Sequence, residues 1–256
     1  MKKLLFILAA MPVAYAVHAQ SYTFKADVVP YEEIMDRSLE DTTLNSYFEF
    51  QPPFQLTLFD RKTLGTFTAG TESGYLIGAN ATYAYAMDPL LGARFRKIAN
   101  KSRVNVAMVV SGPDSQMVVQ WKHLGLDGHP DNEFVNCQVR ISKVSGKITF
   151  HYGASNYVRT ADDSAFSDPQ NTGPEVLLVK LKNDFSSVYE FNTVAGTPQA
   201  PYFTTQFQRM TGLPLENQRF IFTPKNPVAA LGQVSPNSYL INVYPNPVTG
   251  QTLFIQ

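Results

Sequence analysis

The sequence predicts an all-β protein whose body is a β-sandwich of the jelly-roll kind. Apolar residues alternate with polar ones along many short runs, and Gly or Pro residues separate those runs. The chain has 256 residues, a length that one large sandwich can occupy as a single domain. Short strands with one apolar face each require a second sheet to cover that face, so two packed sheets are expected.

The expected strands are rich in Val, Ile, Tyr, Phe and Thr. In chain order they cover residues 21–29, 54–60, 73–79, 81–87, 93–98, 104–110, 115–124, 134–142, 146–153, 174–183, 186–192 and 218–224. A short Gly-containing connection joins two of the runs and predicts a hairpin over 134–152. The run 115–124 should pair beside it, which gives a meander of three strands. Only residues 31–44 carry a weak helical pattern.

Composition excludes some classes of partner. With 44% hydrophobic and 12% aromatic residues the body can bury a large core. The 21 basic and 21 acidic residues cancel, so no nucleic-acid partner is expected from the bulk charge. Trp121 and Cys137 are the single residues of their types, and both are expected in the core. A lone cysteine forms no internal disulfide, so the core alone must stabilise the fold.

The N-terminus has the pattern of a secretory signal peptide. Lys2 and Lys3 precede an apolar run, and small residues end it at Val17 and Ala19. We therefore expect a signal peptide over 1–19, with the Sec translocon as a partner. The alternative, a membrane anchor, is disfavoured because Pro12 interrupts the run. No transmembrane segment is expected after signal cleavage, and the β-sandwich domain is expected over residues 20–224.

The amino-acid composition changes in the C-terminal part of the chain. Residues 225–242 are rich in Pro, Gly and small polar residues and predict a linker. The sequence "VYPNPVTGQTLFI" follows, with Tyr244, Pro245, Asn246, Pro247 and Gly250 leading into an alternating apolar run. This stretch resembles the beginning of the C-terminal sorting domain of proteins exported by the bacterial type IX secretion system.

That resemblance implies an export route and a cellular location for the protein. It implies the type IX secretion machinery as a second partner, and a protein that is secreted or held on the outer-membrane cell surface of a Gram-negative bacterium, reached via the periplasm. Sorting domains of that family continue well beyond their first strand. We therefore expect residues 243–256 to be the start of a truncated sorting domain.

A second resemblance covers most of the body. The motifs "QPPFQLTLFDRKTLGTFTAG", "MVVQWKHLG", "EFVNCQVRI", "SGKITFHYG" and "TGLPLENQRFIFTP" occur in that order. This series resembles a β-rich module of secreted proteins that carry the sorting domain. The resemblance implies a non-enzymatic, adhesin-like or structural surface module.

One loop is a candidate metal site. Asp127, Asp131 and Glu133 lie in a short Gly-containing stretch, and carboxylate oxygens are ligands that Ca²⁺ prefers. Zinc with His123 and His129 is a weaker alternative, because no Cys ligands accompany them. A solvated loop with local Asp and Asn turns is the competing interpretation. We expect no cofactor, with calcium at this loop as the one exception.

Two further features predict ligand binding. Arg94 and Arg96 belong to a basic stretch without acidic residues, which is a candidate site for a surface glycan or lipopolysaccharide. A solvated strand face explains the same pattern. Tyr83 and Tyr157 are candidates for stacking against sugars. They support the alternative of a carbohydrate-binding or glycan-degrading β-sandwich.

No catalytic residue is predicted. The nucleophile motif G-x-S-x-G is absent from the sequence. Among acidic residues on expected strands, Glu133, Glu175 and Glu190 are the candidates, and the pattern pairs none of them. His151 is expected on an outward strand face. A non-enzymatic protein is therefore favoured over an enzyme.

Overall fold

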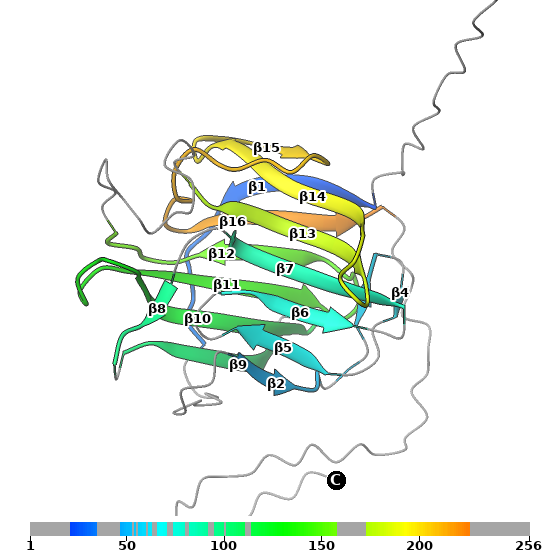
Figure 1. Cartoon of the computed structure of the whole chain (residues 1–256), viewed down its shortest axis with the longest axis horizontal. Helices are drawn as coiled ribbons and strands as arrows, with labels where there is room; N and C mark the ends of the chain where they lie inside the picture. The colour runs from blue at the N-terminus through cyan, green and yellow to red at the C-terminus, as the bar shows by residue number, and fades with distance from the viewer. Residues whose placement is uncertain are drawn as a thin grey trace, which may run out of the picture.

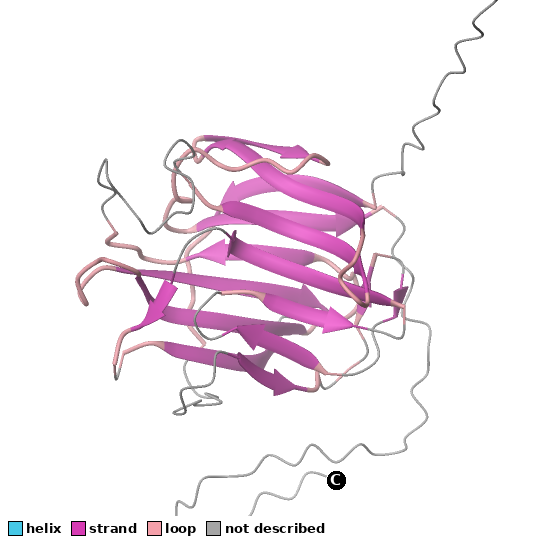
Figure 2. Ribbon diagram, viewed as in Figure 1, coloured by secondary structure: helices cyan, strands magenta, loops and turns pink. Residues whose placement is uncertain are grey.

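The structure is a computed structural model that describes residues 21–34, 47–52, 54, 56–59, 61–62, 66–70, 74–79, 82–91, 95–99, 101–110, 114–157 and 173–225. Within these ranges every regular element is a strand, which confirms the all-β prediction (Figure 2). No helix there is long and apolar enough to cross a membrane. The expected signal peptide, nearly all of the expected linker and the sorting motif lie outside the described residues. Residues 31–34 form neither helix nor strand.

One antiparallel sheet, called sheet A here, has the strand order β1-β16-β12-β11-β10-β8, with β9 also paired to β10. Its strands are β1 (Tyr22–Val28), β8 (Phe95–Lys97), β9 (Arg103–Val109), β10 (Gln116–Leu126), β11 (Phe134–Ser142), β12 (Ile148–Tyr152) and β16 (Gln218–Pro224). The pairing of β10, β11 and β12 confirms the predicted hairpin and meander.

The second antiparallel sheet, sheet B, has the order β15-β14-β13-β7-β6-β5-β2 and faces sheet A (Figure 1). Its strands are β2 (Tyr47–Phe50), β5 (Phe67–Gly70), β6 (Leu76–Ala79), β7 (Tyr83–Leu91), β13 (Glu175–Lys182), β14 (Val188–Thr197) and β15 (Ala200–Thr204). A small hairpin of β3 (Thr57–Leu58) and β4 (Arg61–Lys62) is separate. The two layers confirm the sandwich.

The core lies between the sheets and is rich in aromatic residues. Trp121 is fully buried on β10, and its Nε1 donates a hydrogen bond to the carbonyl of Gly70 on β5 at 2.6 Å. Tyr152 on β12 donates to the carbonyl of Pro89 on β7 at 2.9 Å. These bonds tie the two sheets together while satisfying polar atoms that burial would otherwise leave unpaired. Cys137 is also fully buried, so both core predictions are confirmed.

A bulge in β10 explains why its apolar pattern breaks the period of two. The pairing with β11 shifts between Trp121 and Leu124, and His123 adopts a positive φ of 51° there. The bulge inserts one residue, so Trp121 and Leu124 both reach the core although three positions separate them. His123 occupies the strained position and contacts Phe134 edge-on at 4.3 Å between ring centroids.

Some strands were not expected. The short strands β2, β4, β5 and β15 lie outside the predicted runs, and only Thr57–Leu58 is a strand within the run 54–60. These strands have two to five residues each, so their alternation is too brief to distinguish them from loops. The longer runs in the middle of each sheet were predicted because burial of one face repeats over many residues.

Candidate functional site

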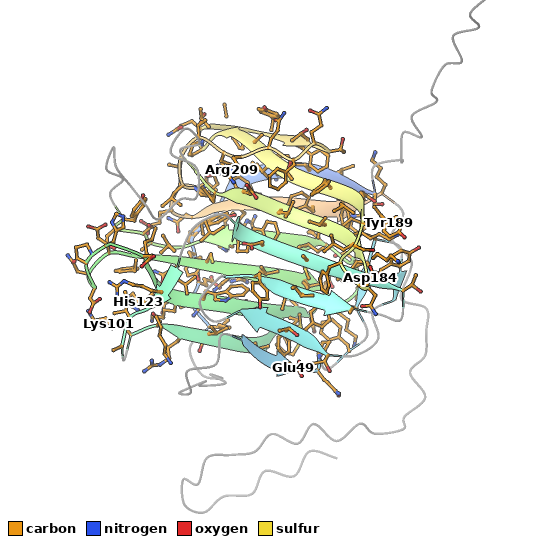
Figure 3. All side chains as sticks on the ribbon, in the orientation of Figure 1. Glu49, Lys101, His123, Asp184, Tyr189 and Arg209 are labelled. Atoms are coloured by element: carbon orange, nitrogen blue, oxygen red, sulfur yellow. The ribbon has the colours of Figure 1, made fainter. Side chains whose placement is uncertain are left out.

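Two ends of the sandwich carry the side chains that could meet a ligand. Figure 3 shows Tyr189 and Asp184 at one end and His123 and Lys101 at the opposite end. The first, called the aromatic end here, is built from the start of β7 and the turn between β13 and β14. The second, called the Arg96 end, is built from β8 and the loop between β10 and β11.

The turn at the aromatic end is held by several hydrogen bonds. The amide of Lys182 donates to the carbonyl of Ser187 at 2.8 Å, and the amide of Phe185 donates to the carbonyl of Lys182 at 2.8 Å. The Asp184 carboxylate accepts from the amide and the hydroxyl of Ser186 at 3.0 and 2.6 Å. A tight, internally bonded turn of this kind presents its side chains with little freedom to lose on binding.

Phe185 occupies a strained backbone position in this turn. Its φ is 59°, a region that residues with a Cβ rarely adopt, and its side chain is 56% exposed. Holding a bulky residue there costs about 1 kcal/mol. Because the Phe185 side chain is largely exposed, burial in the core offsets little of this cost.

Strand register brings Lys180, Tyr83 and Tyr189 together. Lys182 on β13 lies opposite Tyr83 on β7, so Lys180 shares the face of Tyr83 one step along the sheet. The Lys180 ammonium lies 4.2 Å from the centroid of the Tyr83 ring, a cation–π contact. Tyr189 contacts the same ring at 5.3 Å with the ring planes near perpendicular.

The structure refines the sequence prediction at this end. Tyr83, predicted to stack on a sugar, is half-buried beneath Lys180 and Tyr189. Tyr189 and Phe185 are the exposed rings, and sequence reasoning missed both. Tyr189 lies where the register of β13 and β14 shifts, between Lys180–Glu190 and Leu181–Val188. Such an irregularity redirects a side chain and leaves no clear signal in the sequence.

Charge at the aromatic end is partly paired. Lys182 and Asp184 form an exposed ion pair at 2.8 Å. The hydrogen bond from Lys182 lowers the pKa of the Asp184 carboxyl, and the same bond raises the pKa of Lys182. The side chain of Lys180 forms no hydrogen bond or ion pair within the part of the chain that the structure describes.

The Arg96 end gathers several of the predicted ligand residues. The Arg96 guanidinium donates to the carbonyls of Leu126 and His129 at 3.1 and 2.6 Å, and it forms an ion pair with Asp131 at 2.6 Å. Nδ1 of His129 lies 2.8 Å from the Glu133 carboxylate. This end is therefore a loop tied to β8 by its own charges.

The remaining predicted residues of this region fall in different places. Tyr157 contacts the His129 ring at 5.0 Å, and Asp127 is exposed on the same loop. Arg94 lies outside the described residues. Within the described ranges no group of three or more His, Cys, Asp or Glu side chains is arranged to hold a metal ion. Asp131 and Glu133 instead have Arg96 and His129 as partners, so calcium at this loop stays a prediction.

The outer face of sheet A is polar but covered by a segment of the same chain. Residues 29–34, called the strap here, contact side chains of β10, β11 and β12. His151, expected on an outward face, does point outward but is only 3% exposed, because the strap covers it. Its Nε2 donates to the carbonyl of Val29 at 3.0 Å, and its ring contacts Tyr31.

Two glutamines hold the strap by its backbone. Gln138 donates from Nε2 to the carbonyl of Glu32 at 2.8 Å and to Gln120 Oε1 at 2.6 Å. Gln120 Oε1 also accepts from the amide of Ile34 at 3.0 Å. Burial lowers the pKa of His151 to about 4, so this histidine is neutral at physiological pH. The polar outer face of sheet A therefore binds the strap, a segment of the same chain.

Two of the candidate carboxylates, Glu175 and Glu190, have hydrogen-bond partners of their own among the described residues. Glu175 is buried and accepts a hydrogen bond from Arg209, while Glu190 accepts from the amide and hydroxyl of Ser21 at 2.9 and 2.7 Å. Burial is the main cause that raises the pKa of Asp88 to about 8; the Glu175 carboxyl acts in the same direction, and the hydrogen bond from the Leu90 amide opposes both. Sequence reasoning missed Asp88, which is 4% exposed on β7.

The lone thiol is not activated. Burial raises the pKa of Cys137 well above its ordinary value, so the thiol stays protonated. A nucleophilic cysteine needs the opposite shift and access to solvent. Cys137 has neither, which agrees with its place in the core.

One comparison with known proteins identifies the chain. No curated protein and no solved structure matches it. The family model described as "NIDO related" matches residues 21–224, which is the entire sandwich from the start of β1 to the end of β16. The chain therefore belongs to the NIDO-related family.

Proposed function

We propose that this protein is a secreted or cell-surface, adhesin-like β-sandwich module that binds a partner without catalysis and is exported by the type IX secretion system. The observation that carries the proposal is the NIDO-related match over residues 21–224, which makes the body one recognisable extracellular-type module. The two-sheet architecture agrees with that class, since such modules present loops at the ends of a rigid sandwich.

The export route rests on the two ends of the sequence. Residues 1–19 have the signal-peptide pattern, and Tyr244 to Gly250 resemble the start of a type IX sorting domain. A body with a single buried thiol also suits export, because it needs no disulfide to form outside the cytoplasm. Calcium at the loop of Asp127, Asp131 and Glu133 would add to stability in such a setting but is not required by the proposal.

The chemistry of the described residues supports binding over catalysis. Cys137 is a buried, protonated thiol, and His151 is covered by the strap. Glu175 is paired with Arg209. These three groups, which could otherwise act as a nucleophile or a base, therefore already have structural roles.

A second candidate function is carbohydrate binding, and the aromatic end favours it. Phe185 on the turn and Tyr189 at the start of β14 are exposed, and Lys180 and Lys182 lie at the end of β13 that leads into this turn. Aromatic faces next to polar side chains are the usual means of holding a sugar ring. This candidate is compatible with an adhesin whose partner is a glycan.

Expression in a bacterium that has the type IX system tests the proposal. The full chain should lose residues 1–19 and become accessible to added protease on the cell surface, and deletion of the type IX machinery should leave it in the periplasm. Cells that display it should adhere to a glycan- or protein-coated surface better than cells that do not. A mature chain found in the cytoplasm, or displayed equally well without the type IX machinery, would refute the export route.

A further inference from the structure

We infer that the aromatic end binds an acidic sugar, meaning a pyranose that carries a carboxylate, with Tyr189 and Phe185 against the ring and Lys180 on the carboxylate. The inference rests on the proposed binding function and names the ligand class and the residues that would take it. Tyr83 acts as a positioning residue that holds Lys180 and Tyr189.

The exposed rings provide the first part of the site. Phe185 is 56% exposed, and its neighbours Val188 and Tyr189 also present large apolar surface to solvent. The C–H groups on one face of a pyranose carry a small positive charge, and they pack against the electron-rich face of an aromatic ring. The hydrogen bonds within the turn keep these side chains in place before a ligand arrives.

Lys180 provides the second part, because its charge lacks an anionic partner. Its ammonium lies over the Tyr83 ring, and no carboxylate among the described residues forms an ion pair with it. Glu190 lies opposite Lys180 in the strand register, but both of its carboxylate oxygens accept hydrogen bonds from Ser21. A partly exposed ammonium fixed in place next to an aromatic surface is a receptor for an anion.

Local charge favours an acidic sugar over a neutral one. Two acids lie near Lys180 and Lys182: Asp184 is paired with Lys182, and the oxygens of Glu190, opposite Lys180, accept hydrogen bonds from Ser21. A carboxylate on the ligand would complete the pairing that the chain leaves open.

At the opposite end, the predicted anion contact Arg96 is already occupied. The Arg96 guanidinium already binds two carbonyls and the Asp131 carboxylate. A glycan would have to displace those partners. This contrast places the anionic ligand at Lys180, although sequence reasoning expected it at the basic strand.

The test measures binding of the full mature protein to oligogalacturonate and to a neutral malto-oligosaccharide by isothermal titration. Oligogalacturonate should bind more tightly, and added salt should weaken it, because the lysine charge is screened. Lys180→Met, which keeps the stem and removes the charge, should weaken oligogalacturonate binding about tenfold and leave the neutral oligosaccharide unchanged. Tyr189→Ala should abolish binding of both sugars.

Matched controls separate the site from general effects. Lys143→Met removes another lysine that lies over a ring, that of Phe54 at 5.8 Å, and Tyr202→Ala removes another exposed tyrosine. Neither should change binding of either sugar. Tyr83→Leu should reduce the preference for the acidic sugar, because Lys180 loses the ring that holds it, while stacking on Tyr189 persists. Circular dichroism and melting temperature verify that each variant is folded.

Several results would overturn the inference. A wild-type protein that binds no sugar, or prefers the neutral one, excludes the proposed ligand class. A folded Tyr189→Ala variant with unchanged sugar affinity excludes the site. If that variant loses cell adhesion while no sugar binds, the surface belongs to a protein partner, and the acidic-sugar inference is wrong while the adhesin-like function stands.

Discussion

The two ends of the sandwich differ in what they do with their charges. At the Arg96 end the guanidinium, the imidazole of His129 and two carboxylates are bonded to one another and to carbonyls of the same loop. At the aromatic end the rings of Tyr189 and Phe185 are exposed, and the Lys180 ammonium lies over the Tyr83 ring without an ion-pair partner among the described residues. This comparison indicates that a dense cluster of polar residues predicts ligand binding only where its members are not already paired with one another.

The outer face of sheet A belongs with the Arg96 end. His151, Gln120 and Gln138 bind the strap, so they stabilise the fold. Polar residues of this kind should affect stability when they are changed, and residues of the aromatic end should affect binding.

Acid should weaken the fold through His151. Burial lowers the pKa of His151 to about 4, and the nearby Arg140 and Arg219 charges act in the same direction. Between about pH 6.5 and pH 4 the unfolded chain binds a proton that the folded chain excludes, so stability falls as the pH falls, by up to about 3 kcal/mol.

The contribution of His151 to the free energy of unfolding is measured by urea unfolding at several pH values. It is the difference between the wild type and His151→Gln. Subtraction is needed because Asp88, whose pKa burial raises to about 8, acts in the opposite direction: its contribution is present at low pH and is lost as the pH rises toward 8. The variant should be less sensitive to acid than the wild type. Equal slopes for the two proteins between pH 4 and 6.5 would mean that the strap does not bury this histidine in solution.

Arg96→Ala should destabilise the fold by about 1–3 kcal/mol without affecting sugar binding. The substitution leaves the carbonyls of Leu126 and His129 and the Asp131 carboxylate without their shared donor. Urea unfolding measures the loss, and titration with oligogalacturonate measures the binding. Lys122→Ala is the control for loss of a surface cation that pairs with one acid, Glu33. Weakened oligogalacturonate binding by a folded Arg96→Ala protein would place the anion site at the wrong end.

Phe185→Gly should stabilise the fold and weaken ligand binding. Glycine adopts a φ of 59° without strain, so the free energy of unfolding should rise by about 0.5–1 kcal/mol. The exposed ring that would contact the sugar is lost, so affinity should fall. Tyr202→Gly is a matched control, because this exposed aromatic residue lies on β15 and glycine there should destabilise. A less stable Phe185→Gly protein would show that the ring is held by packing.

Calcium should change the melting temperature least. Asp131 pairs with Arg96 and Glu133 with His129, so a calcium ion would have to displace both partners to gain two of its oxygen ligands. Differential scanning calorimetry with added calcium and with a chelator should give melting temperatures within about 1 °C of each other. A clear upward shift with calcium that Asp131→Asn removes would restore the predicted metal site at this loop.

Much of the fold follows from local patterns in the sequence. The alternation in 115–124, 134–142 and 146–153 predicts three neighbouring strands, and β10, β11 and β12 form that meander. The core positions of Trp121 and Cys137 follow from the same period. The strand β15 and the bulged position of Tyr189 leave no comparable pattern, because a short edge strand and an inserted residue both interrupt the alternation.

The candidate site was predictable only in its residue types. Sequence reasoning selected Tyr83 and Arg96 as ligand contacts, and both are half-buried supports: Tyr83 lies under Lys180, and Arg96 holds a loop. Lys180 and Phe185 were not predicted as ligand contacts, because a lysine in an alternating strand and a phenylalanine in a turn are ordinary features of a sequence. Their importance arises from strand register and from a single backbone angle.

The two-layer architecture follows from the amino-acid sequence alone. Burial of every second residue is a local property, and it divides the chain into short strands with one apolar face each. The tertiary structure decided which polar side chains are available to a ligand. Lys180 meets Tyr83, Arg96 meets Asp131, and the strap meets His151, and in each case the partners are far apart in the chain. Such pairings depend on how strands align across the sheets, and no local pattern encodes that alignment.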